Sequence, residues 1–567
     1  MPARATPSVA AVPVATDAPR LFLFGPAVDL TVIAGGLTFI LFPLCLVFAS
    51  QLSVATFLVL LFFCNYPHYM ATNYRIYRNR SQIERYKLFS IYITGLLVLT
   101  AVLGHLMAAF WVKLLYTVYF TWSPFHYSGQ NYGISLMYLR RGGTEPSQRE
   151  RWLLYATFIA CFLMYVGFIN ADGGTTPLFP FQSIGIPREV VRVAYIVLLV
   201  GAVACGTFFL VQVTRRTTRR TLVPVLLLMG SQFAWFAAAT GVPLFSTELG
   251  LRWLPVEALF PTIAFLHCAQ YLGVTAYYAK RDDESAHRSF SFARYFAVLV
   301  MGGVFLWIGT TRVLSEVFSL DYATSFLIML SLINIHHFLM DGAIWKLRDG
   351  RIARLLIAPE GGAREATAVA RRADRAGARR DALAIRPAAP SPAARPAQPW
   401  WRIPAWIAAS LLALALAGTD MIYRMGILQA NEVSRTGNVS KAVSLYGSVW
   451  SVNPRASEAL DGLAFWSLKT GKVSDAVDRW SRSLELNPTE TSAYAHIGLG
   501  EAYLRMGRVA DAIRHLEKAV ELRPDEPSSY VLLSSAYEQQ GDHAKAEQAR
   551  AHAAHATPSN GGRRVFY

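Results

Sequence analysis

Residues 331–345 read SLINIHHFLMDGAIW, a segment that is long enough for about four turns of helix and apolar at most positions. It nevertheless contains two adjacent histidines, His336 and His337, and one aspartate, Asp341. An unpaired polar group in hydrocarbon costs several kcal/mol, so each of these side chains needs a partner. The segment therefore predicts a membrane helix whose polar residues meet polar residues of other helices.

The composition of the whole chain agrees with a membrane protein. Of its 567 residues, 53% are hydrophobic and only 16% are charged, which is too apolar for an ordinary soluble protein. The net charge of +17 comes largely from Arg and Lys in short loops between apolar segments. Such basic loops indicate membrane topology and contact with anionic lipids, so we expect the lipid bilayer as a partner and no nucleic acid.

Apolar segments long enough to cross ~30 Å of hydrocarbon recur along the chain. We place ten spans between residues 27 and 346, at 27–50, 52–77, 86–109, 111–139, 152–171, 189–212, 222–241, 255–279, 291–311 and 322–346, and an eleventh at 403–422. The predicted fold class is therefore all-α, a polytopic transmembrane bundle of about ten plus one helices. Residues 1–26 are expected to be a disordered lead, and the Ala-, Arg- and Pro-rich residues 347–402 a cytoplasmic linker.

Basic residues follow every second predicted span, and the intervening loops are nearly free of positive charge. Because Lys and Arg near helix ends stay in the cytoplasm, this pattern predicts a cytoplasmic N-terminus in a multi-pass protein of the inner cell membrane. The eleventh span then crosses outward and carries the rest of the chain into the periplasm.

Three further histidines, His68, His126 and His267, lie in other predicted spans. All of these spans run inward, and each histidine comes about 7 to 14 residues before a basic loop, at a similar depth to His336. A single buried histidine is more often hydrogen-bonded and structural, but four at one depth favour a shared metal site. The candidate ligands are His68, His126, His267 and either His336 or His337; imidazole suits Fe, Zn, Cu or Ni, so other transition metals remain open beside iron.

Polar residues near these histidines could hold the second ring nitrogens. The candidates are Asn73, Gln130, Asn131, Gln270, Tyr271 and Asp341. We expect Tyr127 and Tyr271 to position a substrate or oxygen, with packing as the simpler alternative, and we count Asp341 with them as a catalytic candidate.

The C-terminal part of the sequence is repetitive. Three residue types recur at intervals of 34 to 36 residues: Gly437, Gly471, Gly507 and Gly541; Ala442, Ala476, Ala512 and Ala546; Pro454, Pro488, Pro524 and Pro558. This period and these residue types resemble tetratricopeptide repeats, in which small residues let helix pairs stack into a solenoid. We therefore predict four repeats over residues 423–558, followed by a tail at 559–567, and a groove that binds a protein or peptide partner.

The four histidine segments also resemble those of the Brp/Blh family of membrane-embedded beta-carotene 15,15'-dioxygenases. The shared features are Pro67-His68, His126-Tyr127, Phe265-Leu266-His267 and His336 followed five residues later by Asp341. The resemblance implies a non-haem Fe(II) held by histidines beside a carotenoid. The chain departs from the family in having Tyr271 where the third segment carries a second histidine.

These observations favour an integral membrane oxidoreductase in which a multi-histidine Fe(II) site acts on an apolar lipid or carotenoid-like substrate. The alternative is a non-enzymatic scaffold or assembly factor, anchored in the membrane, whose histidines are structural. A transporter is a further alternative that lacks a chain of acidic residues. A lipid-linked sugar transferase is disfavoured because almost no loop separates the first two spans, at Ser50 and Gln51.

Overall fold

The structure is a computed structural model that describes residues 21–47, 59–172, 181–245, 256–346, 350–357, 402–489 and 492–556. Every regular element among these residues is a helix, and one isolated bridge joins Ala171 to Ile186. The predicted all-α class is therefore confirmed. The predicted tail at 559–567 and most of the predicted lead and linker lie outside the described residues.

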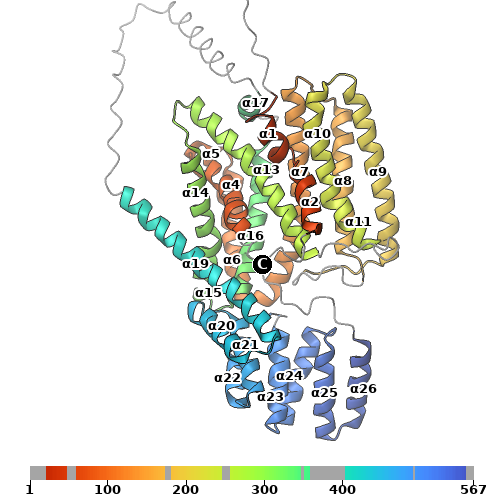
Figure 1. Ribbon diagram of the computed structural model, residues 1–567, viewed down its shortest axis with the longest axis vertical. Helices are drawn as coiled ribbons and strands as arrows, with labels where there is room; N and C mark the ends of the chain where they lie inside the picture. The colour runs from red at the N-terminus through yellow and green to blue at the C-terminus, as the bar shows by residue number, and fades with distance from the viewer. Residues whose placement is uncertain are drawn as a thin grey trace, which may run out of the picture.

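The membrane part contains α-helices and short π-helical segments, labelled η. They are α1 (Pro26–Val28), η1 (Asp29–Ile33), α2 (Thr38–Val47), η2 (Leu61–Asn65), α4 (Tyr66–Tyr77), α5 (Arg80–Arg85), η3 (Leu88–Ile93), α6 (Thr94–Leu106), α7 (Ala108–Arg141), α8 (Gln148–Ile169), α9 (Arg188–Thr214), α10 (Arg219–Gln232), η4 (Phe233–Ala238), α11 (Ala239–Leu244), α13 (Val256–Ser285), α14 (Phe292–Val304), η5 (Phe305–Gly309), α15 (Thr310–Val317), α16 (Tyr322–Ile344) and α17 (Gly350–Leu356). Helix α16 packs against α4, α6 and α7, so the segment with the paired histidines is surrounded by other helices (Figure 1).

Seven helices of the described residues are long and apolar enough to cross a membrane, or eight if the bent pair Pro26–Ile33 and Thr38–Leu44 forms one span. Helices α4, α7 and α13 do not meet this criterion although they lie inside the same bundle. These three carry His68, His126 and His267, and their polar residues lower their hydropathy. The prediction of ten spans in this region thus exceeds the number that composition alone supports.

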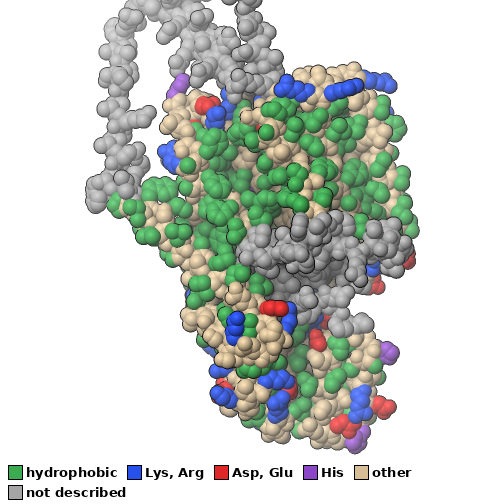
Figure 2. Space-filling view, in the orientation of Figure 1, with side chains coloured by type: hydrophobic (Ala, Val, Ile, Leu, Met, Phe, Trp, Pro, Cys, Tyr) green, Lys and Arg blue, Asp and Glu red, His purple; other side chains and the backbone are tan. Residues whose placement is uncertain are grey.

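The outer face of the bundle is apolar. Figure 2 shows hydrophobic side chains over most of its flank, with Lys and Arg along the rim farthest from the C-terminal helices. On α9, Val193, Val197 and Val200 are 64%, 65% and 64% exposed. Exposed valines at this spacing form a helical stripe that suits contact with lipid.

The first described residues are held in place by Asp29, which is fully buried. Its carboxylate accepts hydrogen bonds from the backbone N–H groups of Leu23, Phe24 and Gly25 and from the Tyr138 hydroxyl. Residues 21–26 are therefore ordered, which corrects the C-terminal boundary of the predicted disordered lead.

The predicted linker also begins with structure. Helix α17 lies within residues 347–402, and its Ile352, Leu355 and Leu356 are buried in the core of the membrane part. Arg141 donates a hydrogen bond to the Leu356 carbonyl and so ties this helix to α7. Apolar side chains spaced at helical intervals therefore keep residues 350–356 on the bundle.

The solenoid consists of four helix pairs, in the order that the repeats predict. Its helices are α19 (Arg402–Arg435), α20 (Val439–Val452), α21 (Ser457–Lys469), α22 (Val473–Leu486), α23 (Ala493–Arg505), α24 (Val509–Leu522), α25 (Pro527–Gln540) and α26 (His543–His555). The four repeat glycines connect the two helices of each pair with φ between +71° and +86°, a conformation that favours glycine. The four repeat alanines are fully buried between helices.

Helix α19 joins the two parts of the chain without a break. Its first half is the predicted eleventh span, and in its second half Tyr423, Ile427 and Ala430 pack against the buried residues of α20. One continuous helix is therefore both the last span and the first helix of the solenoid.

The solenoid also contacts the bundle end formed by α15 and α16. The backbone N–H of Asp321 donates to the Leu486 carbonyl over 2.8 Å, and that of Tyr322 donates to the Arg455 carbonyl over 2.9 Å. The Asp321 carboxylate accepts a hydrogen bond from the Ser457 backbone N–H at 3.0 Å. The solenoid is thus docked on the membrane part as well as tethered to it.

Candidate metal centre

Four histidines from four helices meet inside the bundle. They are His68 on α4, His126 on α7, His267 on α13 and His337 on α16. One ring nitrogen from each can be chosen so that all four nitrogens lie within 4.8 Å of one another. Three of the histidines are 1% exposed, and the side chain of His126 is 10% exposed. The convergence predicted from direction and depth is therefore present in the structure.

Proline residues accompany three of these histidines. Pro67 occupies the first turn of α4, immediately before His68 and after the π-helical segment η2. Pro124 lies two residues before His126 within α7, and Pro261 lies one and a half turns before His267 in α13. A proline removes a backbone N–H, and π-helical turns are frequent at functional sites. The π-helical turn thus lies next to His68, while α7 and α13 continue as α-helices through their prolines.

The four rings form a closed cycle of contacts. His68 lies 4.9 Å from His267 and 4.3 Å from His337, between ring centroids. His126 lies 5.1 Å from His267 and 4.8 Å from His337. Each ring therefore touches two others, and the nitrogens are directed around one common centre.

The donor set fits a transition metal ion. Metal–nitrogen bonds of ~2.0–2.1 Å place the nitrogens of a tetrahedral site about 3.4 Å apart. His337 Nε2 and His126 Nε2 are already 3.2 Å apart, while the wider pairs must approach by roughly one ångström or more. Both ring nitrogens of His267 and the Nδ1 of His68 are buried without a hydrogen-bond partner among the described residues. An ion at the centre would pair with one nitrogen of each ring, so it would account for one of the two orphaned nitrogens of His267.

A second layer of hydrogen bonds orients His337. Its Nδ1 lies 2.9 Å from the Thr72 hydroxyl, and that hydroxyl donates to Asp341 Oδ1 over 2.9 Å. The Tyr271 hydroxyl donates to the same oxygen over 2.7 Å and receives a hydrogen bond from the indole of Trp345. When Nδ1–H of His337 donates to Thr72, Nε2 keeps a free lone pair. This tautomer is the one that binds a metal.

Asp341 is the acidic residue nearest to the four histidines. Its Oδ2 lies 3.5 Å from His337 Nε2 and 4.0 Å from His126 Nε2. The side chain is almost fully buried. The carboxylate can therefore offset part of the charge of a cation while it holds the hydroxyls of Thr72 and Tyr271.

The structure separates the two candidates on α16. His337 joins the cluster, whereas His336 points to the other side of the helix, where its Nε2 lies 3.0 Å from the Thr94 hydroxyl. Adjacent residues of a helix differ by about 100° in direction, so only one of the two can face the centre. His336 is thus placed outside the cluster.

The predicted tyrosines both contact the site. Tyr127 stacks on His267 with 4.0 Å between ring centroids, and Tyr271 lies 4.3 Å from His68. Tyr127 thus covers one face of the His267 ring, whereas Tyr271 belongs to the hydrogen-bond layer around Asp341.

The predicted partners of the ring nitrogens are mostly used elsewhere. Asn73 donates to the Tyr69 carbonyl and Asn131 to Gln232, while Gln130 donates to Gln270 and to the His267 carbonyl. Sequence reasoning missed Thr72 as the partner of His337. The only signal was its position four residues after His68, on the same face of the same helix.

The comparisons with known proteins concern the C-terminal part. A family model described as tetratricopeptide repeat matches residues 467–527 and 497–560, so the solenoid is a tetratricopeptide-repeat domain. Similar solved structures include "Crystal structure of MamA", which is 22% identical, covers 24% of this chain and 77% of that chain, and has a TM-score of 0.22. A second, "Crystal structure of MamA protein", is 19% identical over 30% of this chain and 91% of that chain, with a TM-score of 0.22. No curated protein matches the chain. The Brp/Blh resemblance of the membrane part stays a prediction.

Proposed function

We propose that this tetratricopeptide-repeat protein is a multi-pass membrane protein whose four-histidine cluster binds one divalent transition metal ion. The observation that carries the proposal is the approach of four imidazole nitrogens from separate helices to within 4.8 Å. Buried imidazoles with unused lone pairs favour metal coordination over a purely structural network, because a structural network would pair them. The ligands would be His68, His126, His267 and His337.

The activity that we propose for this centre is oxidation or oxidative cleavage of an apolar substrate such as a carotenoid-like lipid. Fe(II) bound by neutral histidines would supply the activation of oxygen. The protein's own residues would exclude water, orient the ligand rings and position the substrate beside Tyr127. The apolar surroundings, including Phe338 stacked on His126 at 4.7 Å, support an apolar substrate that arrives from the bilayer.

Metal content tests the first proposal. Elemental analysis of the purified protein should find about one transition metal ion per chain, and a His68→Ala and His267→Ala double variant should lose it. His105→Ala and His336→Ala are matched controls, because both remove a histidine of the membrane part outside the cluster, and both should retain the metal. Wild-type protein without metal, or a double variant that keeps it, would reject the proposal.

A second candidate function is that of a membrane-anchored scaffold, and the tetratricopeptide-repeat match favours it. Repeat domains of this kind present a concave surface that binds a segment of another protein. A partner that copurifies stoichiometrically, equally well with the wild type and with the double histidine variant, would support the scaffold. If the double variant loses both the metal and the partner, partner binding depends on the metal centre.

We further propose that the solenoid lies in the periplasm and the opposite rim of the bundle in the cytoplasm. Figure 2 supports this orientation because Lys and Arg gather on the rim away from the solenoid. Reporter enzymes fused after residue 567 should be active only if they work outside the cytoplasm. Activity of a cytoplasm-specific reporter at that position would show that the topology is the reverse of the one proposed.

A further inference from the structure

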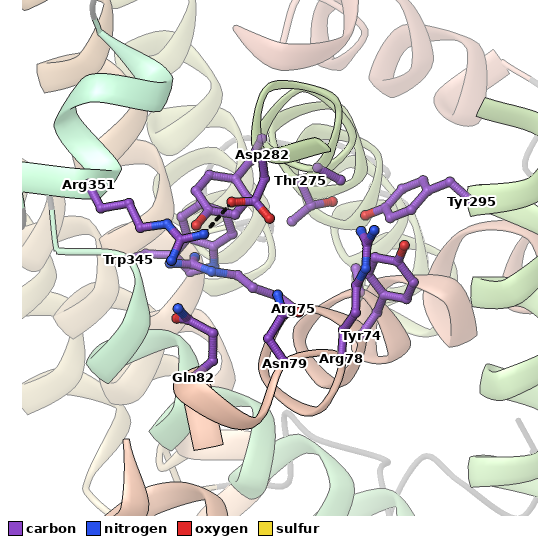
Figure 3. Close-up of a pocket in the computed structure, with 13 residues that line it drawn as sticks. Tyr74, Arg75, Arg78, Asn79, Gln82, Thr275, Asp282, Tyr295, Trp345 and Arg351 are labelled. Atoms are coloured by element: carbon purple, nitrogen blue, oxygen red, sulfur yellow. Dashed lines mark hydrogen bonds and ion pairs between the residues drawn. The ribbon is translucent and has the colours of Figure 1, made fainter. Parts of the chain in front are cut away.

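A pocket separate from the histidine cluster opens at the basic rim of the bundle. It covers about 410 Å³ of space between atoms, part of which is open solvent, and lies between the C-terminal ends of α4 and α13, beside α17. Three arginines and one aspartate line it, a formal charge of 3 − 1 = +2, namely Arg75, Arg78, Arg351 and Asp282. Figure 3 shows Arg351 and Asp282 on one side of the pocket, Arg78 and Tyr295 on the other, and Arg75 between them.

The carboxylates beside the pocket pair with two of its three arginines. Asp282 bonds Arg351, and the neighbouring Asp283 bonds Arg78, each with an oxygen 2.5 Å from a guanidinium nitrogen. Arg75 has no ion pair among the described residues, and its Nη2 donates a hydrogen bond to the Ile344 carbonyl. No carboxylate of the described residues therefore lies within ion-pair distance of Arg75, and only Asp341 acts on it from farther away.

Arg75 is held in a fixed plane by aromatic rings. Its guanidinium carbon lies 3.7 Å from the ring centroid of Trp345 and 4.4 Å from that of Tyr278. Its Nε and Nη1 are buried without a hydrogen-bond partner among the described residues. Unpaired N–H groups on an immobilised guanidinium cost free energy, and an anion that enters beside Arg75 and displaces the covering side chains would pair with them.

The other lining groups indicate which anion fits. The amides of Asn79 and Gln82 and the hydroxyl of Thr275 also line the pocket. Together with Arg75 they offer more donors than the two oxygens of a carboxylate need. A phosphate group has more oxygens and carries one or two negative charges, which matches the excess positive charge.

We propose that this pocket binds a phosphate group, carried by an anionic lipid headgroup or by free phosphate. The pocket lies at the basic end of the spans, and this is the level of the membrane at which headgroup phosphates lie. This site does not require the metal centre, because none of its lining residues belongs to the histidine cluster.

Binding can be measured as thermal stabilisation of the purified full-length protein in detergent. The probes are dihexanoyl phosphatidylglycerol, inorganic phosphate and, as the carboxylate comparison, octanoate. Saturable stabilisation by the phosphatidylglycerol alone supports the headgroup, and equal stabilisation by inorganic phosphate supports free phosphate. No saturable effect of either, or tighter binding of octanoate, overturns the proposal.

The variant Arg75→Gln should weaken the binding of the effective probe at least tenfold. Arg80→Gln is the matched control, because Arg80 is a nearby arginine whose side chain is 92% exposed. It should bind like the wild type. If Arg75→Gln does not fold, Arg351→Gln at the pocket rim replaces it, with weaker binding expected again. Unchanged affinity in the folded variant overturns the assignment.

Discussion

At the scale of single residues, the histidine cluster is supported by one hydroxyl that connects three helices. Thr72 of α4 contacts the ring of His337 and the carboxylate of Asp341, both on α16, and the hydroxyl of Tyr271 on α13. Such outer contacts fix the tautomer of a ligand histidine and its orientation. A change at Thr72 therefore alters the site without removing a ligand.

We expect Thr72→Val to lower metal affinity by about 10- to 100-fold, because valine keeps the volume but cannot hold His337 and Asp341. Competition with a chelator of known affinity, using Zn(II), measures the change. Thr100→Val is the control, since the Thr100 hydroxyl bonds only the Leu96 carbonyl on an exposed face of α6. Equal affinities in the wild type and Thr72→Val would show that Thr72 does not support the site.

At the scale of helices, the solenoid is built by close approach of small residues to large rings. Gly498 of α23 faces Trp480 of α22, and a Cβ at this position would lie 2.3 Å from the indole. Gly447 of α20 has open space instead. Packing therefore requires glycine at position 498, whereas position 447 has room for a larger residue.

Gly498→Ala should destabilise the protein by about 1–3 kcal/mol, because the buried indole cannot move away without strain. Gly447→Ala should stabilise it by about 0.5–1 kcal/mol, since alanine restricts the unfolded chain and favours helix. Hydrogen exchange of the solenoid helices in the full-length protein reports both changes. Similar effects of the two substitutions would contradict the packing described here.

A second feature at this scale is a pair of histidines between α23 and α24. The Nδ1 atoms of His496 and His515 are 2.9 Å apart, and Tyr503 stacks on His515. Burial, followed by the charge of His515, lowers the pKa of His496 to about 4. Burial also lowers the pKa of His515, and Arg514 acts in the same direction.

These pKa shifts predict that acid loosens α23 and α24. The unfolded chain, with a histidine pKa of about 6.5, binds more protons than the folded chain between about pH 6.5 and pH 4, so stability falls as the pH drops through this window. Hydrogen exchange of these helices, corrected for intrinsic rates, should be faster at pH 5 than at pH 7. A His496→Gln and His515→Gln double variant should lose most of this difference; a double variant with the wild-type pH response would show that other groups cause it.

At the scale of the whole molecule, one helix connects the histidine cluster to the docked solenoid. Asp321 caps the N-terminus of α16 by accepting a hydrogen bond from the Thr324 backbone, and it also bonds Ser457 of α21. His337 lies on the same helix, deeper in the bundle. The helix that carries His337 of the cluster therefore also helps to position the solenoid.

Asp321→Ala should release the first turn of α21 from the membrane part, because the buried N–H of Ser457 loses its acceptor. We expect at least tenfold faster hydrogen exchange there in the full-length protein. Glu316→Gln is the control, since the ion pair of Glu316 with Arg455 at 3.1 Å is at the surface and contributes only about 0–1 kcal/mol. Unchanged exchange in Asp321→Ala would show that the Asp321 carboxylate is not needed to hold α21 on the bundle.

Much of the architecture follows from the sequence alone, because it depends on period and composition. The recurrence of Gly437 and its equivalents predicted the helix pairs of the solenoid, since only glycine readily adopts the positive φ at each turn. Apolar length predicted the helical bundle, and the direction and depth of His68, His126 and His267 predicted their meeting. Local hydrophobicity could not show that residues 350–356 return to the core, because that depends on the surface they meet.

The tertiary structure alone decided which side chains face one another. The choice between His336 and His337 depends on the rotation of α16 about its axis, and packing against α4, α6 and α7 sets that rotation. The partner of His337 is Thr72, on a helix that lies 265 residues earlier in the chain. Which atoms of distant helices come within hydrogen-bond distance is set by how the helices pack, and a linear pattern carries no record of that packing.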